Sequence, residues 1–89
     1  KKLQQVEPLN DFLLSCLFEG GVHKIADVKP YLQSEAFKSL KDMAVFNKVV
    51  NKLYYVEWLN EEVDLSADTL WHIGVETASK QASSLAATD

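Results

Sequence analysis

Apolar side chains recur at every second position between residues 12 and 18, which is the pattern of a β-strand with one buried face. The residues on that face are Phe12, Leu14, Cys16 and Phe18. Two adjacent glycines, Gly20 and Gly21, follow closely, and glycine reaches positive φ without steric cost. The sequence therefore predicts a tight turn and a β-hairpin whose second strand runs over 22–26.

Two short helices are predicted after this hairpin. Asp27 can cap the first, because a proline lies in its first turn, where a missing backbone N–H leaves no hydrogen bond unmade. Ser34 can cap the second, in which Phe37 and Leu40 are three residues apart and share one face. Neither segment is long enough to be stable unless it packs on a sheet.

A second hairpin is predicted over 49–56, with Asn51 and Lys52 at its turn, since asparagine tolerates the left-handed conformation that a two-residue turn requires. In its return strand, one face is assigned to the core: Tyr54, Val56 and Trp58. The opposite face is the candidate partner-binding surface: Leu53, Tyr55, Glu57 and Leu59. The pattern leaves open the reverse arrangement, in which helices cover this face and the first set is solvated.

A two-turn helix is predicted near the end of the chain. Ser66 serves as its N-cap, Asp68 lies in its first turn, where the helix dipole favours an acid, and Gly74 ends it. The alanine- and serine-rich segment 75–89 has too few large apolar residues to pack, so a frayed or disordered tail is expected there. The predicted fold is a small single α+β domain over 1–74, with two antiparallel β-hairpins and short helices packed on the sheet.

Length and composition agree with one small soluble domain. A chain of 89 residues with 47% hydrophobic residues can build a single core. Charged and polar residues interrupt every apolar stretch before the roughly 18 residues of a membrane helix, so no membrane association is expected. One cysteine cannot form an internal disulfide, which favours a cytoplasmic location.

Charge is distributed unevenly along the chain, whose net charge is −4. Segment 22–52 holds six lysines against three acids, whereas 53–89 holds seven acids against one lysine. All nine basic residues are lysines, so the planar guanidinium group that reads guanine edges is absent. We therefore expect no nucleic-acid binding by this chain alone.

No pattern of reactive residues indicates a catalytic, cofactor-binding or metal site. Cys16 lies at an inward strand position and is interpreted as a small buried hydrophobe. His23 and His72 show no metal-ligand spacing with it or with each other. The acidic run after residue 60 lacks the oxygen spacing of a calcium loop, and no nucleophile or phosphate-binding motif is present.

Several short motifs resemble, in order, those of the bacterial Domain of Unknown Function 2442 family: Phe18-Glu19-Gly20, Asp27, Leu40-Lys41-Asp42, Phe46, Trp58, Asn60, and Asp64-Leu65-Ser66 with Asp68-Thr69-Leu70. The most specific family-motif positions are Trp58, Asn60, Asp64 and Ser66. This chain departs from the family pattern where Leu59 and Ala67 replace prolines and where Glu61-Glu62 replaces a single glycine.

The resemblance implies a small α+β domain with no established activity. It also suggests partnership with a small co-encoded protein, or with a second copy of the chain. The leading hypothesis is a non-enzymatic protein-interaction or accessory module, including the antitoxin-like or regulatory half of a two-protein system. The alternatives are a DNA-associated transcriptional regulator, which the lysine-rich middle segment suggests, and a small enzyme.

Overall fold

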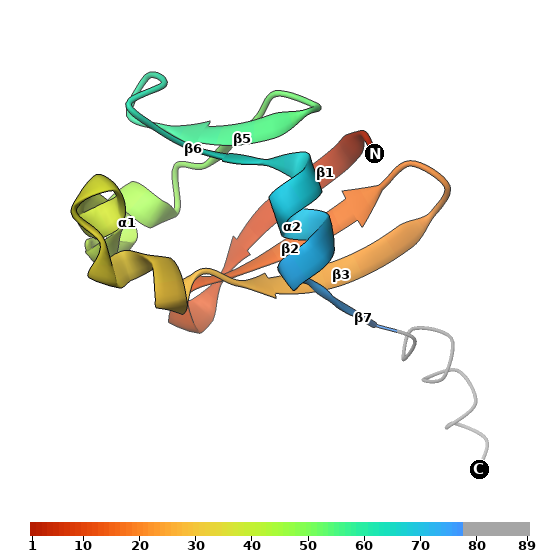
Figure 1. Cartoon of the computed structure of the whole chain (residues 1–89), viewed down its shortest axis with the longest axis horizontal. Helices are drawn as coiled ribbons and strands as arrows, with labels where there is room; N and C mark the ends of the chain where they lie inside the picture. Colours follow the sequence, from red (N-terminus) through yellow and green to blue (C-terminus); the bar gives the residue numbers. More distant parts are fainter. Residues whose placement is uncertain (78–89) are drawn as a thin grey trace, which may run out of the picture.

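The structure is a computed structural model, which describes residues 1–77. It contains two antiparallel sheets (Figure 1). The first has the order β1-β2-β3-β7, with β1 at Leu3–Leu9, β2 at Leu13–Phe18, β3 at Val22–Asp27 and β7 at Val75–Glu76. The second has the order β4-β5-β6, with β4 at Val50–Asn51, β5 at Tyr55–Trp58 and β6 at Val63–Ser66. The predicted α+β class is confirmed, although the two predicted hairpins belong to different sheets.

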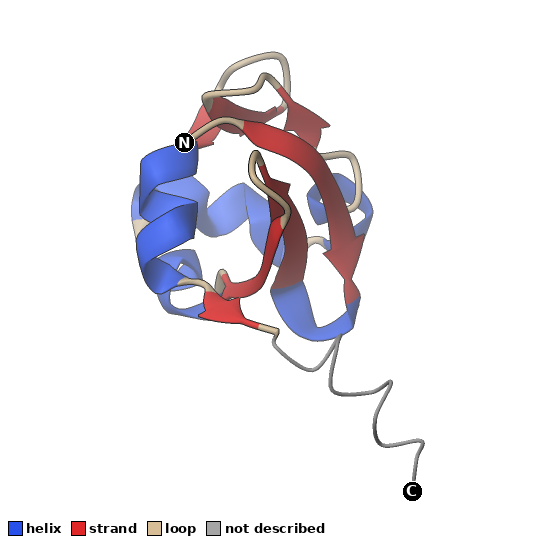
Figure 2. Ribbon diagram, turned by 90° about the vertical axis from the view of Figure 1, so that its right-hand side faces the viewer, coloured by secondary structure: helices blue, strands red, loops and turns tan. Residues whose placement is uncertain are grey.

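Short helical segments complete the fold. They are η1 at Asn10–Phe12, η2 at Lys29–Gln33, η3 at Glu35–Lys41, α1 at Met43–Phe46 and α2 at Ala67–Ile73. Segments η2, η3 and α1 gather at one end of the two sheets, while α2 lies between the sheets further along (Figure 1). The end-on view shows these helices placed around the strands (Figure 2).

The core fills the space between the inner faces of the two sheets. From the first sheet, three side chains of β2 are fully buried: Leu14, Cys16 and Phe18. From the second sheet, Val56 and Trp58 are fully buried, and register places Leu65 and Val63 beside them on the same face. Phe46 of α1 stacks on Trp58, with 6.0 Å between ring centroids. The alternation of apolar residues thus determines which face of each sheet is buried.

The first hairpin forms as predicted, with Phe18 opposite Val22 across the glycine turn. Phe12, predicted to be part of the strand, instead lies in η1 with φ 59°. Its ring remains half-buried and packs edge-to-face on Phe46, with 5.3 Å between centroids.

Strand β1 was not predicted from the sequence. It is an edge strand whose side chains, apart from Leu3, are exposed or half-buried. A bulge between Leu3 and Gln5 also breaks its alternation. A strand with one buried position and an irregular period leaves little signal in the sequence.

The turn of the second hairpin lies two residues later than predicted. The backbone N–H of Lys52 donates to the carbonyl of Tyr55 over 2.8 Å, so Leu53 and Tyr54 form the turn. Leu53 adopts the left-handed conformation, with φ 72°. The side chain of Asn51 stabilises this turn from outside, because its Oδ1 accepts a hydrogen bond from the N–H of Leu53 at 2.7 Å.

This shift changes the assignment of several side chains. Tyr54, predicted to be in the core, lies in the turn and is 60% exposed. Val56 and Trp58 are buried as predicted. Glu57 has the predicted outward orientation in the strand alternation, yet it is only 7% exposed.

The predicted helix caps have different outcomes. Ser66 caps α2 as predicted, since its Oγ accepts a hydrogen bond from the N–H of Thr69 at 3.0 Å. Asp27 lies two residues before Lys29, the first residue of η2, so Val28 takes the N-cap position, but Asp27 still accepts from the N–H of Lys29 at 2.9 Å. Ser34 precedes η3 but makes no capping bond, because its hydroxyl donates to the carbonyl of Tyr31 instead.

Ordered pairing continues past residue 74, the predicted end of the domain. In β7, Val75 pairs with Ile25, and the N–H of Thr77 donates to the carbonyl of His23 at 3.0 Å. Gly74 ends α2 with φ −74°, so it is not needed for a left-handed turn. A Cβ at this position would approach the carbonyl oxygen of Leu70 to 2.8 Å, which explains why glycine stands where α2 meets β3. The remainder of the predicted tail, 78–89, lies outside the described residues.

Candidate functional site

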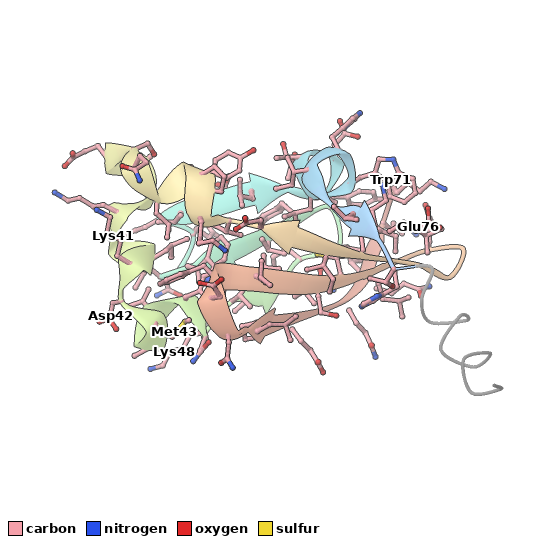
Figure 3. The ribbon with its side chains drawn as sticks, turned by 90° about the horizontal axis from the view of Figure 1, so that it is seen from below. Lys41, Asp42, Met43, Lys48, Trp71 and Glu76 are labelled. Carbon is pink, nitrogen blue, oxygen red and sulfur yellow. The ribbon has the colours of Figure 1, made fainter. Side chains whose placement is uncertain are left out.

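A pocket of about 620 Å³ lies between α1, the β4–β5 hairpin and the loop that follows β5. Its apolar lining residues are Ala44, Val45, Val50, Trp58 and Leu59. Its polar lining residues are Lys48, Glu57, Asn60 and Glu62. Figure 3 places Lys48 beside Asp42 and Met43 at the α1 end of the molecule, opposite the end that carries Trp71.

Two backbone features build the pocket walls. The carboxylate of Asp42 caps α1 by accepting from the N–H of Ala44 at 2.9 Å, which fixes the first wall. On the other side, Leu59, Asn60 and Glu61 are three consecutive residues in the left-handed region, with φ 53°, 53° and 74°. Residues other than glycine are uncommon in this region of φ and ψ, and those that adopt it cluster at functional sites. The loop is closed by a hydrogen bond from the N–H of Glu62 to the carbonyl of Leu59.

The conformation of Leu59 explains one departure from the family pattern. The resemblance to the family implies a proline at this position, but proline is restricted to φ near −65° and cannot adopt φ 53°. This loop therefore requires a residue other than proline.

Glu57 is the buried charge of this site. Its side chain is 9% exposed, and its Oε1 is fully buried with no hydrogen-bond partner among residues 1–77. Among the described residues, the cation paired with Glu57 is Lys52, whose Nζ lies 3.8 Å from Oε2, beyond hydrogen-bond distance. Register places Glu57 between Val50 of β4 and Asp64 of β6 on the outer face of the second sheet.

Exposed apolar side chains gather on the same hairpin. Among residues 1–77, six large hydrophobic residues are exposed, and four of them belong to β4, its turn or the loop after β5: Val50, Leu53, Tyr54 and Leu59. We call this set the hairpin surface. The other two, Leu9 and Val75, belong to the first sheet. Val50 and Leu59 line the pocket, whereas Leu53 and Tyr54 lie at the hairpin turn, at the other end of β5.

The structure separates the four predicted partner-binding residues. Leu53 and Leu59 are 49% and 41% exposed and lie at opposite ends of β5. Tyr55 is half-buried in the strand, and Glu57 is buried. Only Glu57 and Leu59 line the pocket.

The four family-motif positions also separate. Trp58 and Asn60 line the pocket, and the indole N–H of Trp58 donates to the carbonyl of Phe46 at 2.9 Å. Asp64 is exposed on β6, and Ser66 caps α2. These positions therefore combine pocket lining with structural roles.

Sequence reasoning missed the α1 side of the pocket. Ala44, Val45 and Lys48 come from a four-residue helix and its exit, too short for a periodic signal. They meet residues 57–62 only through tertiary packing. A sequence signal that could have pointed to the pocket was Glu57, an acidic residue between the apolar Val56 and Trp58 in a predicted strand.

A second group of polar side chains connects the strands of the first sheet. His23 lies between two hydroxyls, with its Nε2 2.6 Å from Ser15 Oγ and its Nδ1 2.7 Å from Thr77 Oγ1. A hydroxyl can donate or accept, so either tautomer of the ring is satisfied. A serine beside a histidine is also the start of a nucleophile–base pair. Neither residue lines the pocket, so this group is best explained as a connection between β2 and the end of β7.

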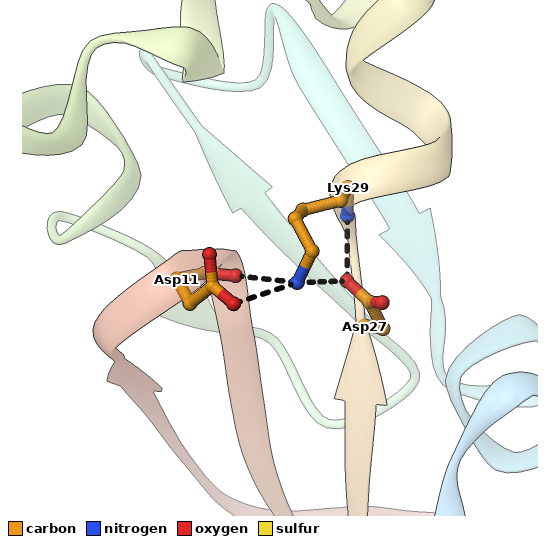
Figure 4. Close-up of polar contacts among 3 residues, drawn as sticks. All are labelled: Asp11, Asp27 and Lys29. Atoms are coloured by element: carbon orange, nitrogen blue, oxygen red, sulfur yellow. Dashed lines mark hydrogen bonds and ion pairs between the residues drawn. The ribbon is translucent and has the colours of Figure 1, made fainter.

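A third polar group ties η1 to η2 (Figure 4). The ammonium of Lys29 lies 3.2 Å from Asp11 Oδ2 and 3.1 Å from Asp27 Oδ1. Slight burial raises the pKa of Asp27, but its hydrogen bonds with Lys29 outweigh this, so the pKa lies below its usual range. The hydrogen bond to Asp27 in turn raises the pKa of Lys29. These exposed pairs contribute little stability.

Polar contacts also involve most lysines of the middle segment. Lys29, Lys38 and Lys52 lie near carboxylates, and Lys24 donates to the carbonyl of Trp71 at 2.8 Å. Lys24 also lies 3.8 Å from the centre of the Trp71 ring. This pairing reduces the positive field that the lysine-rich segment 22–52 indicated.

Cys16 is buried as predicted, and burial raises the pKa of its thiol to about 12. Within the described part of the chain, no three His, Cys, Asp or Glu side chains gather closely enough to hold a metal ion. Over the same residues, no helix combines the length and apolar character needed to cross a membrane.

Comparison with known proteins identifies a family for this chain. A family model described as "Protein of unknown function (DUF2442)" matches residues 3–76, nearly all of the described fold. No curated protein and no solved structure matches the chain.

Proposed function

This chain belongs to the DUF2442 family of proteins of unknown function, and we propose that it acts as a non-enzymatic protein-interaction module whose partner binds the hairpin surface. The observation that carries the proposal is that exposed Val50, Leu53, Tyr54 and Leu59 all belong to β4, its turn or the loop after β5. Exposed aliphatic and aromatic groups gain free energy when a partner removes them from water. Tyrosine is also enriched among the residues that dominate binding energy at interfaces.

The partner is a protein, either a small co-encoded one or a second copy of the chain. An antitoxin-like or regulatory role in a two-protein system is a narrower form of the proposal and rests on the family resemblance alone. A cytoplasmic location is part of the proposal and is supported by the single, buried cysteine, Cys16.

The test compares two matched double variants. Leu53→Ser with Tyr54→Ser removes apolar side chains that are 49% and 60% exposed on the hairpin surface. Leu9→Ser with Val75→Ser removes two exposed hydrophobic side chains from the first sheet and serves as the control. Each protein is used to capture partners from the native host, and its self-association is followed by light scattering.

The proposal predicts a partner, or a dimer, that the unmodified chain and the control retain and the hairpin variant loses. Circular dichroism should show both variants folded. Equal loss in both variants would show that the contact depends on general surface hydrophobicity. Equal retention in both would place the contact elsewhere on the molecule and overturn the proposal.

A further inference from the structure

Glu57 has a buried carboxylate with unused hydrogen-bonding capacity, and we infer that it anchors a basic side chain, lysine or arginine, presented by the partner protein. This inference rests on the proposed function and names the chemistry of the partner group that enters the pocket. The anchor is distinct from the hairpin turn, where Leu53 and Tyr54 supply apolar contact.

The first argument is the state of the carboxylate. An ionised carboxylate offers about four lone pairs for hydrogen bonds. Among residues 1–77, none donates to Oε1, which is fully buried, and Lys52 approaches Oε2 only to 3.8 Å. Burying a charge without hydrogen bonds is unfavourable, so such groups are normally paired. Glu57 lines the pocket, so a cationic group that enters the pocket lies beside this carboxylate and offsets its buried charge.

The second argument is the match between the pocket and a basic side chain. Val45, Val50 and Leu59 offer apolar surface to the methylene stem of a lysine or arginine, while the cationic head meets the carboxylate. Glu57 and Glu62 against Lys48 give the lining a formal charge of −1, from two acids and one base. A cation is therefore favoured over an anion.

The third argument concerns the kind of cation. Calcium takes six to eight oxygen ligands, and magnesium demands an octahedral set. The described residues hold no cluster of three or more acidic, histidine or cysteine side chains, so Glu57 has too few companions for a metal ion. One unpartnered carboxylate beside an apolar wall suits a single ammonium or guanidinium group.

The experiment titrates the full chain, labelled for NMR, with small probes. N-acetyl-lysine methylamide and its arginine counterpart carry the proposed group, while the norleucine counterpart has a similar stem without the charge. Both basic probes should shift the amide signals of residues 57–60, with Kd near the millimolar range expected of single side chains. Norleucine should bind at least fivefold more weakly.

Two charge variants locate the anchor. Glu57→Gln should weaken binding of the lysine probe at least tenfold, because it keeps the shape and removes the charge. Asp64→Asn is the matched control, since Asp64 is the exposed carboxylate directly opposite Glu57 on β6, and it should change Kd less than threefold. An equal change in Kd for the two variants would show that the probe responds only to the overall negative charge, and it would overturn the inference.

A third variant covers the case in which Glu57→Gln does not fold. Lys52, whose side chain is 42% exposed, is the residue that competes for Oε2. Lys52→Met should therefore tighten binding of the lysine probe severalfold. Unchanged or weaker binding would contradict the inference, as would norleucine binding as well as lysine.

These outcomes separate the inference from the proposed function. If the hairpin variant loses its partner but Glu57→Gln keeps both partner and probe, the interaction module stands and the anchor is wrong. If the lysine probe binds through Glu57 but no partner depends on the hairpin surface, the site is a receptor for basic groups and the proposed function fails.

Discussion

The indole N–H of Trp58 donates a hydrogen bond to the backbone carbonyl of Phe46 over 2.9 Å, and both side chains are fully buried. Phe46 is the last residue of α1 and Trp58 is the last residue of β5. The bond therefore joins the two elements that supply Val45 and Glu57 to opposite sides of the pocket. Core packing and pocket shape depend on the same contact.

Trp58→Phe should lower the free energy of unfolding by about 1–3 kcal/mol, because it leaves the carbonyl of Phe46 unpaired in the core. Trp58→Ala should cost about 3–5 kcal/mol through loss of buried volume. Urea denaturation followed by circular dichroism measures both. Trp71→Phe is the control, since Trp71 is only half-buried, and its change should stay below about 1 kcal/mol. Equal effects at the two tryptophans would contradict the assignment of Trp58 to the core.

Two serines that both looked like helix caps should differ in their effect on stability. Ser66→Ala should cost about 1 kcal/mol, because its Oγ accepts from the N–H of Thr69. Ser34→Ala should change stability by less than about 0.5 kcal/mol, since its exposed hydroxyl bonds only to the carbonyl of Tyr31. Thermal unfolding of the two single variants tests this, and Ser66→Asp should restore the cap.

Two glycine substitutions should destabilise the fold for different physical reasons. Gly74 has an ordinary φ of −74°, but the methyl group of a Gly74→Ala variant would lie 2.8 Å from the Cβ of Lys24. We expect a loss of about 1–3 kcal/mol from this overlap. Gly20→Ala meets open space at φ 90° and should cost about 1–2 kcal/mol from backbone strain alone. The variant Gly20→Asn distinguishes them, because asparagine tolerates positive φ and should recover part of the loss at that site.

Cys16 should be unreactive in the folded protein. Burial raises the pKa of its thiol from 9.0 to about 12, so the folded state favours the neutral form. This contribution to stability is complete below pH 9 and is lost as the pH rises toward about 12. Labelling with a thiol reagent at pH 8 should proceed only through opening of the fold and accelerate in urea. Fast labelling without denaturant would show that the thiol is accessible.

The parts of the fold that could be predicted from the sequence are those with dense local signals. Alternating Leu14, Cys16 and Phe18 followed by glycines specified the first hairpin, and Ser66 with Gly74 bounded α2. In each case the residues that define the element are adjacent in the chain. Local propensity and tertiary packing then agree.

The remaining features depend on contacts that the sequence pattern does not express. Leu53 takes a left-handed conformation that leucine disfavours, so the turn forms two residues later than the sequence predicted. Asn51, the expected turn residue, instead supports the turn from its side chain and donates to the carbonyl of Leu3 at 2.8 Å. The pocket joins Ala44 to Glu62 across a distance in sequence that no local pattern spans.

The contacts of β1 also bear on aggregation. This strand forms the outer edge of the first sheet, where unpaired backbone groups could recruit another chain. At one end, Leu3 is occupied by hydrogen bonds with Leu53 and Asn51, and near the other Pro8 has no N–H to offer. Extension of this edge by a neighbouring molecule is therefore blocked at both ends. The fold thus protects this edge, where any extended chain could bind, while the exposed apolar residues Val50, Leu53, Tyr54 and Leu59 belong to the other sheet and its loops.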